Sequence, residues 1–409
     1  MKIALVNDTH FGCRNDNPNY HEYMYKFWQE QFFPYLEQND IKTIIHLGDI
    51  LDRRKYVNFK TLTDFNNKIV SQFKKYDTHF IVGNHDTYYK NTNEVNAPKE
   101  LLSEFKVYSD PQKITIAGHD ILIIPWVTPE NYDRTKMMLE QETADIVMGH
   151  LEIKGFEMHT GHHSDVGVEK EMFKRFETVL SGHFHKKSDD GHIFYLGCQY
   201  EMTWSDYKCP KHFHIYDTET RELTPIRNPL TIHHKIYYND ETTDYANFDY
   251  NTCNHKYIKL IVEKKTDYFM FDKFVDNIYQ NAKPYDLKII EDYSDLDAST
   301  VADDIANKSE DTPTLLDNYI DELETDLEKS RLNSITITLG LKIFNDSKTM
   351  LQPGEDMLYF IVLFFMASIS GILILLGKSV ASPPKFELKN ILWGLILGVP
   401  NFFSLLFML

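Results

Sequence analysis

Short apolar runs alternate with helical stretches through the first two hundred residues of this 409-residue chain. The runs that predict strands are bounded by polar or glycine-containing segments, at 3–6, 43–47, 79–82, 145–148, 178–180 and 192–196. Residues 114–127 predict a hairpin with Gly118 near its middle. Helical periodicity lies between the strands, at 20–37, 58–75, 98–105 and 130–142. The alternation predicts a layered α/β fold with helices on the faces of a sheet.

A smaller unit follows. Residues 257–263 predict a strand, 268–281 an amphipathic helix and 287–291 a second strand, which is a β-α-β block of the size of a cap. After an acidic stretch, residues 314–332 place apolar side chains at helical spacing with acids on the remaining face. Such a stripe is usually core packing, but it also suits docking on a partner.

The last seventy-five residues differ in character. The runs 357–376 and 391–409 carry no charge, and each is long enough to span a bilayer, although a buried helical hairpin is the alternative. The loop between them holds Lys378, Lys385 and Lys389, which predicts a cytoplasmic loop and leaves the preceding part outside. The segment WGLILGVPNFFSLLF resembles a helix of EamA-type transporters. We interpret 335–409 as a foreign fragment from a fusion, frameshift or assembly junction, with a genuine membrane anchor as the alternative.

The formal charge of −18 is unusual for a nucleic-acid enzyme, because phosphate contacts normally use lysine and arginine. Much of the acidity is local, since residues 291–328 hold fourteen acidic residues and one lysine. Bound divalent cations can also reverse the local charge of an acidic site. The four cysteines are widely spaced and form no C-x-x-C, and the chain opens on KIALV without a signal-peptide pattern. We therefore expect reduced thiols and a cytoplasmic setting.

Five polar clusters each begin where an apolar run ends. They are Asp8-Thr9-His10, Gly48-Asp49-Ile50-Leu51-Asp52, Gly83-Asn84-His85-Asp86, Gly149-His150 and Gly182-His183-Phe184-His185. Each cluster alone is a weak signal, because a single histidine is usually structural. In open α/β sheets, however, sites form where strand ends meet loops. Carboxylates and imidazoles without thiolates suit Mn, Fe or Zn, so the five clusters together predict a metal site.

At these residues the chain resembles the calcineurin-like metallophosphoesterases, whose blocks run D-x-H, G-D-x-x-D, G-N-H-[DE], G-H and G-H-x-H. The segments GDILDRR, IVGNHD, IPWVTPENYDR, MGHLEIKGF and LSGHFHK further resemble SbcD-type DNA-repair nucleases, including the recombination endonuclease subunits of tailed phages. The resemblance covers about residues 1–334. It implies a β-sandwich flanked by helices, a small β-α-β cap, and then a C-terminal helix. We divide the chain into a nuclease domain (1–235), a cap for DNA recognition (236–295), an acidic linker with a partner-binding helix (296–334) and the anomalous tail (335–409).

The resemblance also implies roles for the residues of the five blocks. One metal would be held by Asp8, His10, Asp49 and His185, and the other by Asp49, Asn84, His150 and His183. His85 would be the catalytic acid or transition-state stabiliser, and Asp52 would orient it, although a helix N-cap or turn carboxylate is the simpler reading of Asp52. The cofactors would be two divalent ions, Mn²⁺ or Mg²⁺, which activate water and clamp phosphate oxygens during in-line attack.

The partners implied are DNA, an SbcC-type coiled-coil ATPase docked on 314–332, and a second copy of the chain. Basic residues beside two of the blocks are solvated charges or DNA backbone contacts: Arg53, Arg54, Lys55, Lys186 and Lys187. We expect the three histidines of EMHTGHHSD, at 159, 162 and 163, to lie in a loop near the active site. Two other functions stay open, namely a metallophosphoesterase acting on a phosphoprotein or nucleotide, and a membrane-anchored regulatory protein.

Overall fold

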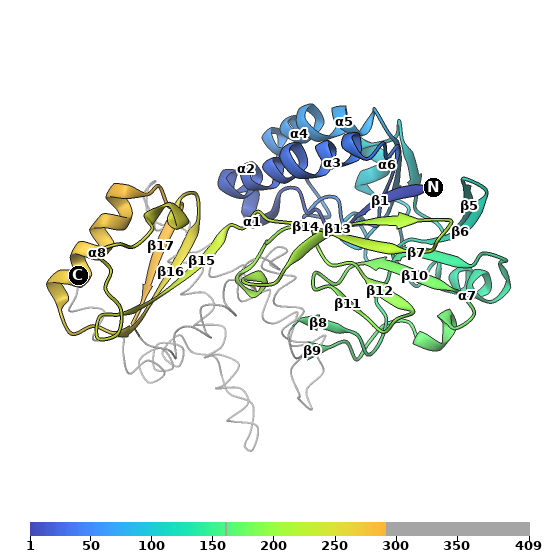
Figure 1. Ribbon diagram of the computed structural model, residues 1–409. Helices are drawn as coiled ribbons and strands as arrows, with labels where there is room; N and C mark the ends of the chain where they lie inside the picture. The colour runs from blue at the N-terminus through green and yellow to red at the C-terminus, as the bar shows by residue number, and fades with distance from the viewer. Residues whose placement is uncertain (160–161, 292–409) are drawn as a thin grey trace, which may run out of the picture. The chain divides into compact units, whose positions relative to one another are not determined.

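The computed structural model describes residues 1–159 and 162–291, and of residues 157–159 and 162–163 the backbone alone (Figure 1). The chain divides into two compact units, Met1–Lys308 and Ser309–Leu409, and all described residues belong to the first. The helix expected at 314–332 and the spans expected at 357–376 and 391–409 lie outside the described residues. Within residues 1–159 and 162–291, no helix has both the length and the apolarity that crossing a membrane requires.

Two six-stranded sheets form the larger domain. The first has the order β14-β13-β1-β2-β3-β4, built from β1 (Lys2–Val6), β2 (Thr43–His46), β3 (Asp77–Ile81), β4 (Lys106–Tyr108), β13 (Lys211–Asp217) and β14 (Leu223–Asn228). The second has the order β11-β12-β10-β7-β6-β5, built from β5 (Gln112–Ile116), β6 (His119–Ile124), β7 (Ile146–His150), β10 (Thr178–Gly182), β11 (Ser188–Asp189) and β12 (Ile193–Tyr195). In each sheet four neighbouring strands are parallel. The carboxyl ends of those strands therefore meet at one edge of their sheet.

The two sheets pack face to face. One apolar cluster draws Leu5 and Ile45 from the first sheet and Ile121, Met148 and Leu180 from the second. Because the outer faces are also covered, the parallel strands are apolar on both sides, which explains the continuous apolar runs of the sequence. The resulting β-sandwich is the architecture that the resemblance implied.

Helices cover the outer faces of the sandwich (Figure 1). On the first sheet lie α2 (Pro18–Lys26), α3 (Phe33–Gln38), α4 (Phe59–Phe65) and α5 (Ser71–Phe73). Helix α7 (Tyr132–Gln141) packs on the second sheet. The short helix α6 (Ala97–Leu101) follows β3, and α1 (Cys13–Asp16) is a single turn in which residues 14–16 have left-handed φ. The stretches predicted as single helices at 20–37 and 58–75 are each interrupted by a π-helical segment, Phe27–Phe32 and Asn66–Val70. Pro34, near the start of α3, lacks the N–H that an uninterrupted α-helix would need there.

The cap is a three-stranded parallel sheet of order β15-β16-β17, with β15 (His233–Asn239), β16 (Tyr257–Lys264) and β17 (Asp286–Ile290). Helix α8 (Tyr268–Asn281) buries Phe271, Phe274 and Ile278 against it. The predicted strand-helix-strand order is present in β16, α8 and β17. Strand β15 was not predicted from the sequence, and the domain boundary predicted at 235/236 lies inside it.

Single-turn 3₁₀ helices occur at Lys170–Phe173, Trp204–Asp206 and Tyr250–Cys253. The histidine-rich stretch expected as a loop instead contains a short antiparallel pair, β8 (Glu157–His159) and β9 (His162–His163).

Candidate metal centre

The five polar clusters meet at one edge of the sandwich. Asp8 and His10 follow β1, Asp49 and Asp52 follow β2, and Asn84 and His85 follow β3. From the second sheet, His150 ends β7, while His183 and His185 follow β10. Ligand atoms of three residue groups lie within 4.8 Å of one another: Asp8, His10 and His185; His10, Asp49 and His85; and Asp49, His150 and His183.

The first half of the centre gathers around His10. Its Nε2 lies 3.1 Å from His185 Nε2, 3.9 Å from Asp8 Oδ1 and 3.7 Å from Asp49 Oδ2. His185 Nε2 is also 3.8 Å from Asp8 Oδ1. These four residues are the set expected to hold one metal.

The second half gathers around Asn84. Its Oδ1 lies 2.9 Å from His150 Nε2 and 3.0 Å from His183 Nδ1, and His150 Nε2 is 3.3 Å from Asp49 Oδ2. Since Asp49 Oδ2 lies beside histidine nitrogens of both halves, Asp49 occupies the position expected of a bridging ligand.

His85 lies beside the first half, with its ring centroid 4.8 Å from that of His10. Its Nδ1 is 2.6 Å from the main-chain carbonyl of Asp52, and its amide N–H donates to Asp49 Oδ1. The carboxylate of Asp52 instead faces His10 Nδ1 at 3.5 Å. Asp52 thus contacts His85 through its backbone and His10 through its side chain.

Comparisons with known proteins agree with this geometry. A family model described as calcineurin-like phosphoesterase matches residues 1–187. Exonuclease subunit 1 of Enterobacteria phage T4 is 30% identical over 344 residues, which cover 81% of this chain and 96% of that relative. The chain belongs to the calcineurin-like phosphoesterases. It is a hydrolase that acts on phosphodiester bonds. The chain is also similar to an archaeal phosphodiesterase of known structure, in a match that covers 56% of this chain and 100% of the other at 16% identity and a TM-score of 0.27.

Asp86 holds two loops of this phosphoesterase together. Its buried carboxylate accepts N–H bonds from Gly83 and Asp49 at 2.9 Å each, and from Ile50 at 2.9 Å. Burial and the charge of Asp49 raise the pKa of Asp86 to about 7. A Cβ at Gly83 would overlap the carboxylate of Asp49, so the close approach of these loops requires glycine there.

Four of the expected ligands have a strained backbone. Asp8, His10, Asp49 and His183 all have positive φ, at 48°, 42°, 58° and 88°. Non-glycine residues pay for this conformation, and such strain gathers at functional sites where the surroundings enforce it. Here the strained backbone turns the side chains at the strand ends toward one another.

The electrostatics of the centre suit cations. Burial alone would lower the pKa of His10 and of His150. The carboxylates of Asp52 and Asp49 outweigh burial at His10, and that of Asp49 outweighs it at His150, so that both pKa values rise to about 9. Although burial raises the pKa of Asp49, His150 and His85 bring it well below its usual value. The rings of His10 and His150 therefore hold protons that a bound cation would displace.

The donor set fits the dinuclear metal centre that calcineurin-like phosphoesterases use. The buried Oδ1 of Asp8 has no hydrogen-bond partner among the described residues. His150 Nδ1 is 2.7 Å from the carbonyl of Leu47, which can only accept, so Nδ1 carries the proton and Nε2 is left to bind a metal. The thiol of Cys198 faces the carbonyls of Tyr200 and His185, at 3.2 and 3.5 Å, and burial raises its pKa to about 12.

Several neighbours of the centre were not anticipated. Glu152 Oε1 lies 3.9 Å from His183 Nε2, and the ring of Trp126 is 5.0 Å from that of His183. Lys211 Nζ donates to the carbonyl of His185 at 3.2 Å. Glu152 and Trp126 lie in the segments MGHLEIKGF and IPWVTPENYDR, which carried the finer resemblance, whereas nothing near Lys211 in the sequence pointed to the site.

Proposed function

We propose that this phosphoesterase is a metal-dependent DNA nuclease that processes DNA ends in recombination and repair. The observation that carries the proposal is the match to an exonuclease subunit along 96% of that relative's length, together with the five convergent ligand clusters. A match of this extent includes the cap, which a phosphatase acting on small molecules does not need.

In this proposal Asp8, His10, Asp49 and His185 hold one divalent ion, and Asp49, Asn84, His150 and His183 hold the other. Bound Mn²⁺ or Mg²⁺ would supply Lewis-acid activation of water and neutralise charge on the phosphate oxygens. Asp52 fixes the ring of His10 through its carboxylate, because a carboxylate beside the free ring nitrogen of a metal-binding histidine holds the ring in one orientation.

His85 would donate a proton to the leaving sugar oxygen. Because the carbonyl of Asp52 accepts from Nδ1, the second nitrogen, Nε2, is the atom that can give a proton to the substrate. Burial lowers the pKa of His85, with Asp49 opposing this. The negative charge of an approaching phosphodiester favours the protonated ring, so substrate binding itself prepares the acid.

Basic and aromatic side chains beside the centre support a nucleic-acid substrate. Lys55 and Tyr56 are exposed on the loop that follows Asp52, and Phe59 is exposed at the start of α4, with Tyr56 and Phe59 at 66% and 86% exposure. Stacking aromatics next to cations are a common surface for unpaired bases. Arg53 has another role, since its guanidinium binds Asp16 at 2.6 Å.

Three further parts of the proposal concern the assembly. The nuclease would act as a dimer in the cytoplasm of a bacterial or phage-infected cell, with an SbcC-type ATPase bound to residues 314–332. Residues 335–409 would be foreign to it, in keeping with a match that leaves a fifth of the chain uncovered. Sequencing the locus across codons 330–360 tests this, and an uninterrupted natural reading frame would refute it.

The substrate is tested with the full chain in Mn²⁺ on four substrates: linear duplex DNA, single-stranded DNA, a nucleotide monoester and a phosphoprotein. We expect cleavage of both DNAs, lost in chelator. Hydrolysis of the nucleotide or phosphoprotein without DNA cleavage would instead favour the alternative phosphoesterase function.

A further inference from the structure

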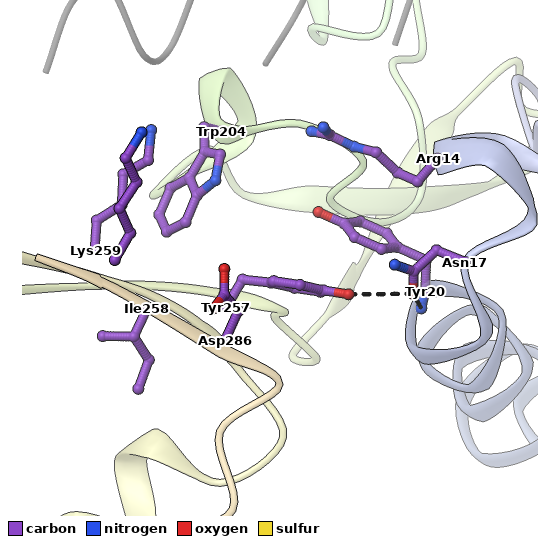
Figure 2. A pocket seen from close by; sticks show the side chains of 9 residues that line it. Arg14, Asn17, Tyr20, Trp204, Tyr257, Ile258, Lys259 and Asp286 are labelled. Carbon is purple, nitrogen blue, oxygen red and sulfur yellow. Dashed lines mark hydrogen bonds between the residues drawn. The ribbon is translucent and has the colours of Figure 1, made fainter. Parts of the chain in front are cut away.

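A hollow of about 270 Å³ lies apart from the metal ligands, between the loop after β1 and the cap strands β16 and β17 (Figure 2). Polar side chains of its wall contact one another. The hydroxyl of Tyr257 donates to Asn17 at 3.1 Å, and Lys259 Nζ lies 4.5 Å from the ring centroid of Trp204. A carboxylate to which the proposed function gives no role, that of Glu152, lies instead beside a metal ligand.

Two histidines of the metal centre have an oxygen acceptor behind them. His10 turns Nε2 toward the other ligand atoms and Nδ1 toward the carboxylate of Asp52, at 3.5 Å. His150 also turns Nε2 toward the ligand atoms, and its Nδ1 faces the carbonyl of Leu47 at 2.7 Å. An acceptor on the outward nitrogen of a metal-binding histidine fixes both the tautomer and the orientation of the ring. The centre therefore uses these acceptors to aim the two rings.

His183 follows the same pattern with its two nitrogens exchanged. Its Nδ1 lies 3.0 Å from Asn84 Oδ1, so Nδ1 is the nitrogen that faces the ligand atoms. Its Nε2, on the opposite edge of the ring, lies 3.9 Å from Glu152 Oε1. That separation lets the carboxylate attract the Nε2 proton, and an approach of about 1 Å would make a hydrogen bond.

The ring of His183 is confined by aromatic neighbours. The ring centroids of Trp126, Phe184 and His150 lie 5.0, 5.0 and 5.2 Å from its own. Packing of this kind restricts where the ring can lie, but it does not decide which nitrogen carries the proton. That choice needs a polar partner at one nitrogen, and Glu152 is placed to provide it at Nε2.

The backbone around Glu152 is held firmly. The N–H of Ile153 donates to the hydroxyl of Tyr195 at 2.9 Å, and the carbonyl of Glu152 accepts from the N–H of Val168 at 2.8 Å. A Cβ at Gly167 would overlap that carbonyl oxygen, so the turn before Val168 can approach this closely only with glycine. The side chain of Glu152 therefore starts from a fixed position beside the centre, where it is 25% exposed.

We propose that Glu152 is a positioning residue for the second metal ion, the one held by Asp49, Asn84, His150 and His183. Its carboxylate accepts from Nε2 of His183, which leaves Nδ1 without a proton and aimed at the ion. The contact closes to hydrogen-bond distance when the ion fixes the ring. The inference rests on the proposed function, because it concerns the second of its two ions, and it adds a residue outside the five clusters.

The test is calorimetric titration of the metal-free full chain with Mn²⁺ alone. Glu152→Ala should weaken binding of one of the two ions by roughly 10- to 100-fold and leave the other unchanged. Glu152→Gln should weaken the same ion by less, because the amide oxygen still accepts a hydrogen bond but carries no charge. Glu169→Ala is the matched control, because Glu169 is 63% exposed beside Lys154, and it should leave both affinities unchanged.

Asn84→Ala identifies the affected ion, since Asn84 is expected to bind the second ion only. In that background, Glu152→Ala should leave the Mn²⁺ binding that remains unchanged. A merely structural role of Glu152 would instead weaken both ions and lower the melting temperature in chelator.

Wild-type affinity for both ions in Glu152→Ala, equal weakening of both, or the same loss in Glu169→Ala would overturn the proposal. If the alanine variant does not fold, Glu152→Gln decides, and wild-type affinity for both ions in that variant would overturn it. Because Mn²⁺ binding is measured without DNA, a chain that shows the expected pattern but cuts no DNA would refute the proposed function and leave the role of Glu152 standing.

Discussion

Replacing Lys211 with methionine should destabilise the protein by about 3–5 kcal/mol, the cost of leaving one member of a buried ion pair alone. Lys211 Nζ lies 2.5 Å from Asp206 Oδ1, and the two side chains are 3% and 9% exposed. Asp206 also accepts N–H bonds from Met202 and Thr203 at 2.9 Å each. Without the lysine, the carboxylate stays buried with only neutral donors, namely the two main-chain N–H groups and the hydroxyl of Thr203 at 3.4 Å.

The pKa of Asp206 gives an independent measure of how much the buried ion pair stabilises the fold. Burial raises this pKa, but the charge of Lys211 outweighs burial and brings it from 3.8 to about 2. A carboxyl group whose pKa is lower in the folded state stabilises the fold above its unfolded pKa, here by about 2 kcal/mol. That contribution is lost as the pH falls from 3.8 toward 2, so the wild type should lose stability in that window more steeply than Asp206→Asn.

Urea unfolding at neutral pH measures the effect through the shift of the midpoint at constant slope. The matched control is Lys60→Met, because Lys60 also lies 2.5 Å from a carboxylate, that of Asp64, but is 78% exposed. We expect the control to cost less than 1 kcal/mol. The double variant Lys211→Met, Asp206→Leu should cost less than the sum of its single variants, since it leaves no lone buried charge. A loss in Lys211→Met no larger than in the control, or full additivity, would refute the reasoning.

The other predictions concern the metal centre. Because His10 and His150 hold protons up to a pKa of about 9, Mn²⁺ affinity should rise with pH toward 9, about tenfold per pH unit for each proton displaced. Calorimetry in buffers of different ionisation enthalpy detects those protons, and a pH-independent affinity with no proton release would count against the assignment. Gly83→Ala should lose Mn²⁺ binding at least a hundredfold, since its Cβ overlaps Asp49, and unchanged binding by calorimetry would contradict the predicted contact. Saturating Mn²⁺ at 100 times its Kd should stabilise the fold by about 2.7 kcal/mol relative to chelator. Equal melting temperatures in the two conditions would argue against a metal centre that only the folded chain forms.

Much of the metal centre was predictable because its residues follow strands. Parallel strands end at a common edge, so polar residues placed directly after β1, β2, β3, β7 and β10 had to approach one another. The local pattern therefore predicted that these side chains would converge without knowledge of the strand order, whereas their assignment as metal ligands came from the family resemblance.

Contacts that depend on long-range packing were not predictable in this way. Lys211 reaches His185 because β13 pairs antiparallel with β1, a pairing that no local pattern signals. The turn from Arg14 to Asp16 is left-handed, and none of its residues is a glycine that would have indicated this conformation. The two contacts of Asp52 show the same limit, because spacing brings a residue to the site but does not decide whether its carbonyl or its carboxylate meets His85.

The central claim is that two metal ions and His85 cut DNA at this site. Its most direct test measures bound Mn²⁺ per chain by elemental analysis, together with the rate of DNA cleavage, in the same samples of wild type, His85→Ala, Asp49→Ala and the control Asp272→Ala, whose residue is exposed on α8. The account predicts two ions and full cleavage in wild type and control, two ions with cleavage slower by about 10²- to 10⁴-fold in His85→Ala, and loss of both in Asp49→Ala. Wild-type cleavage by His85→Ala, or at most one ion in the wild type, would contradict it.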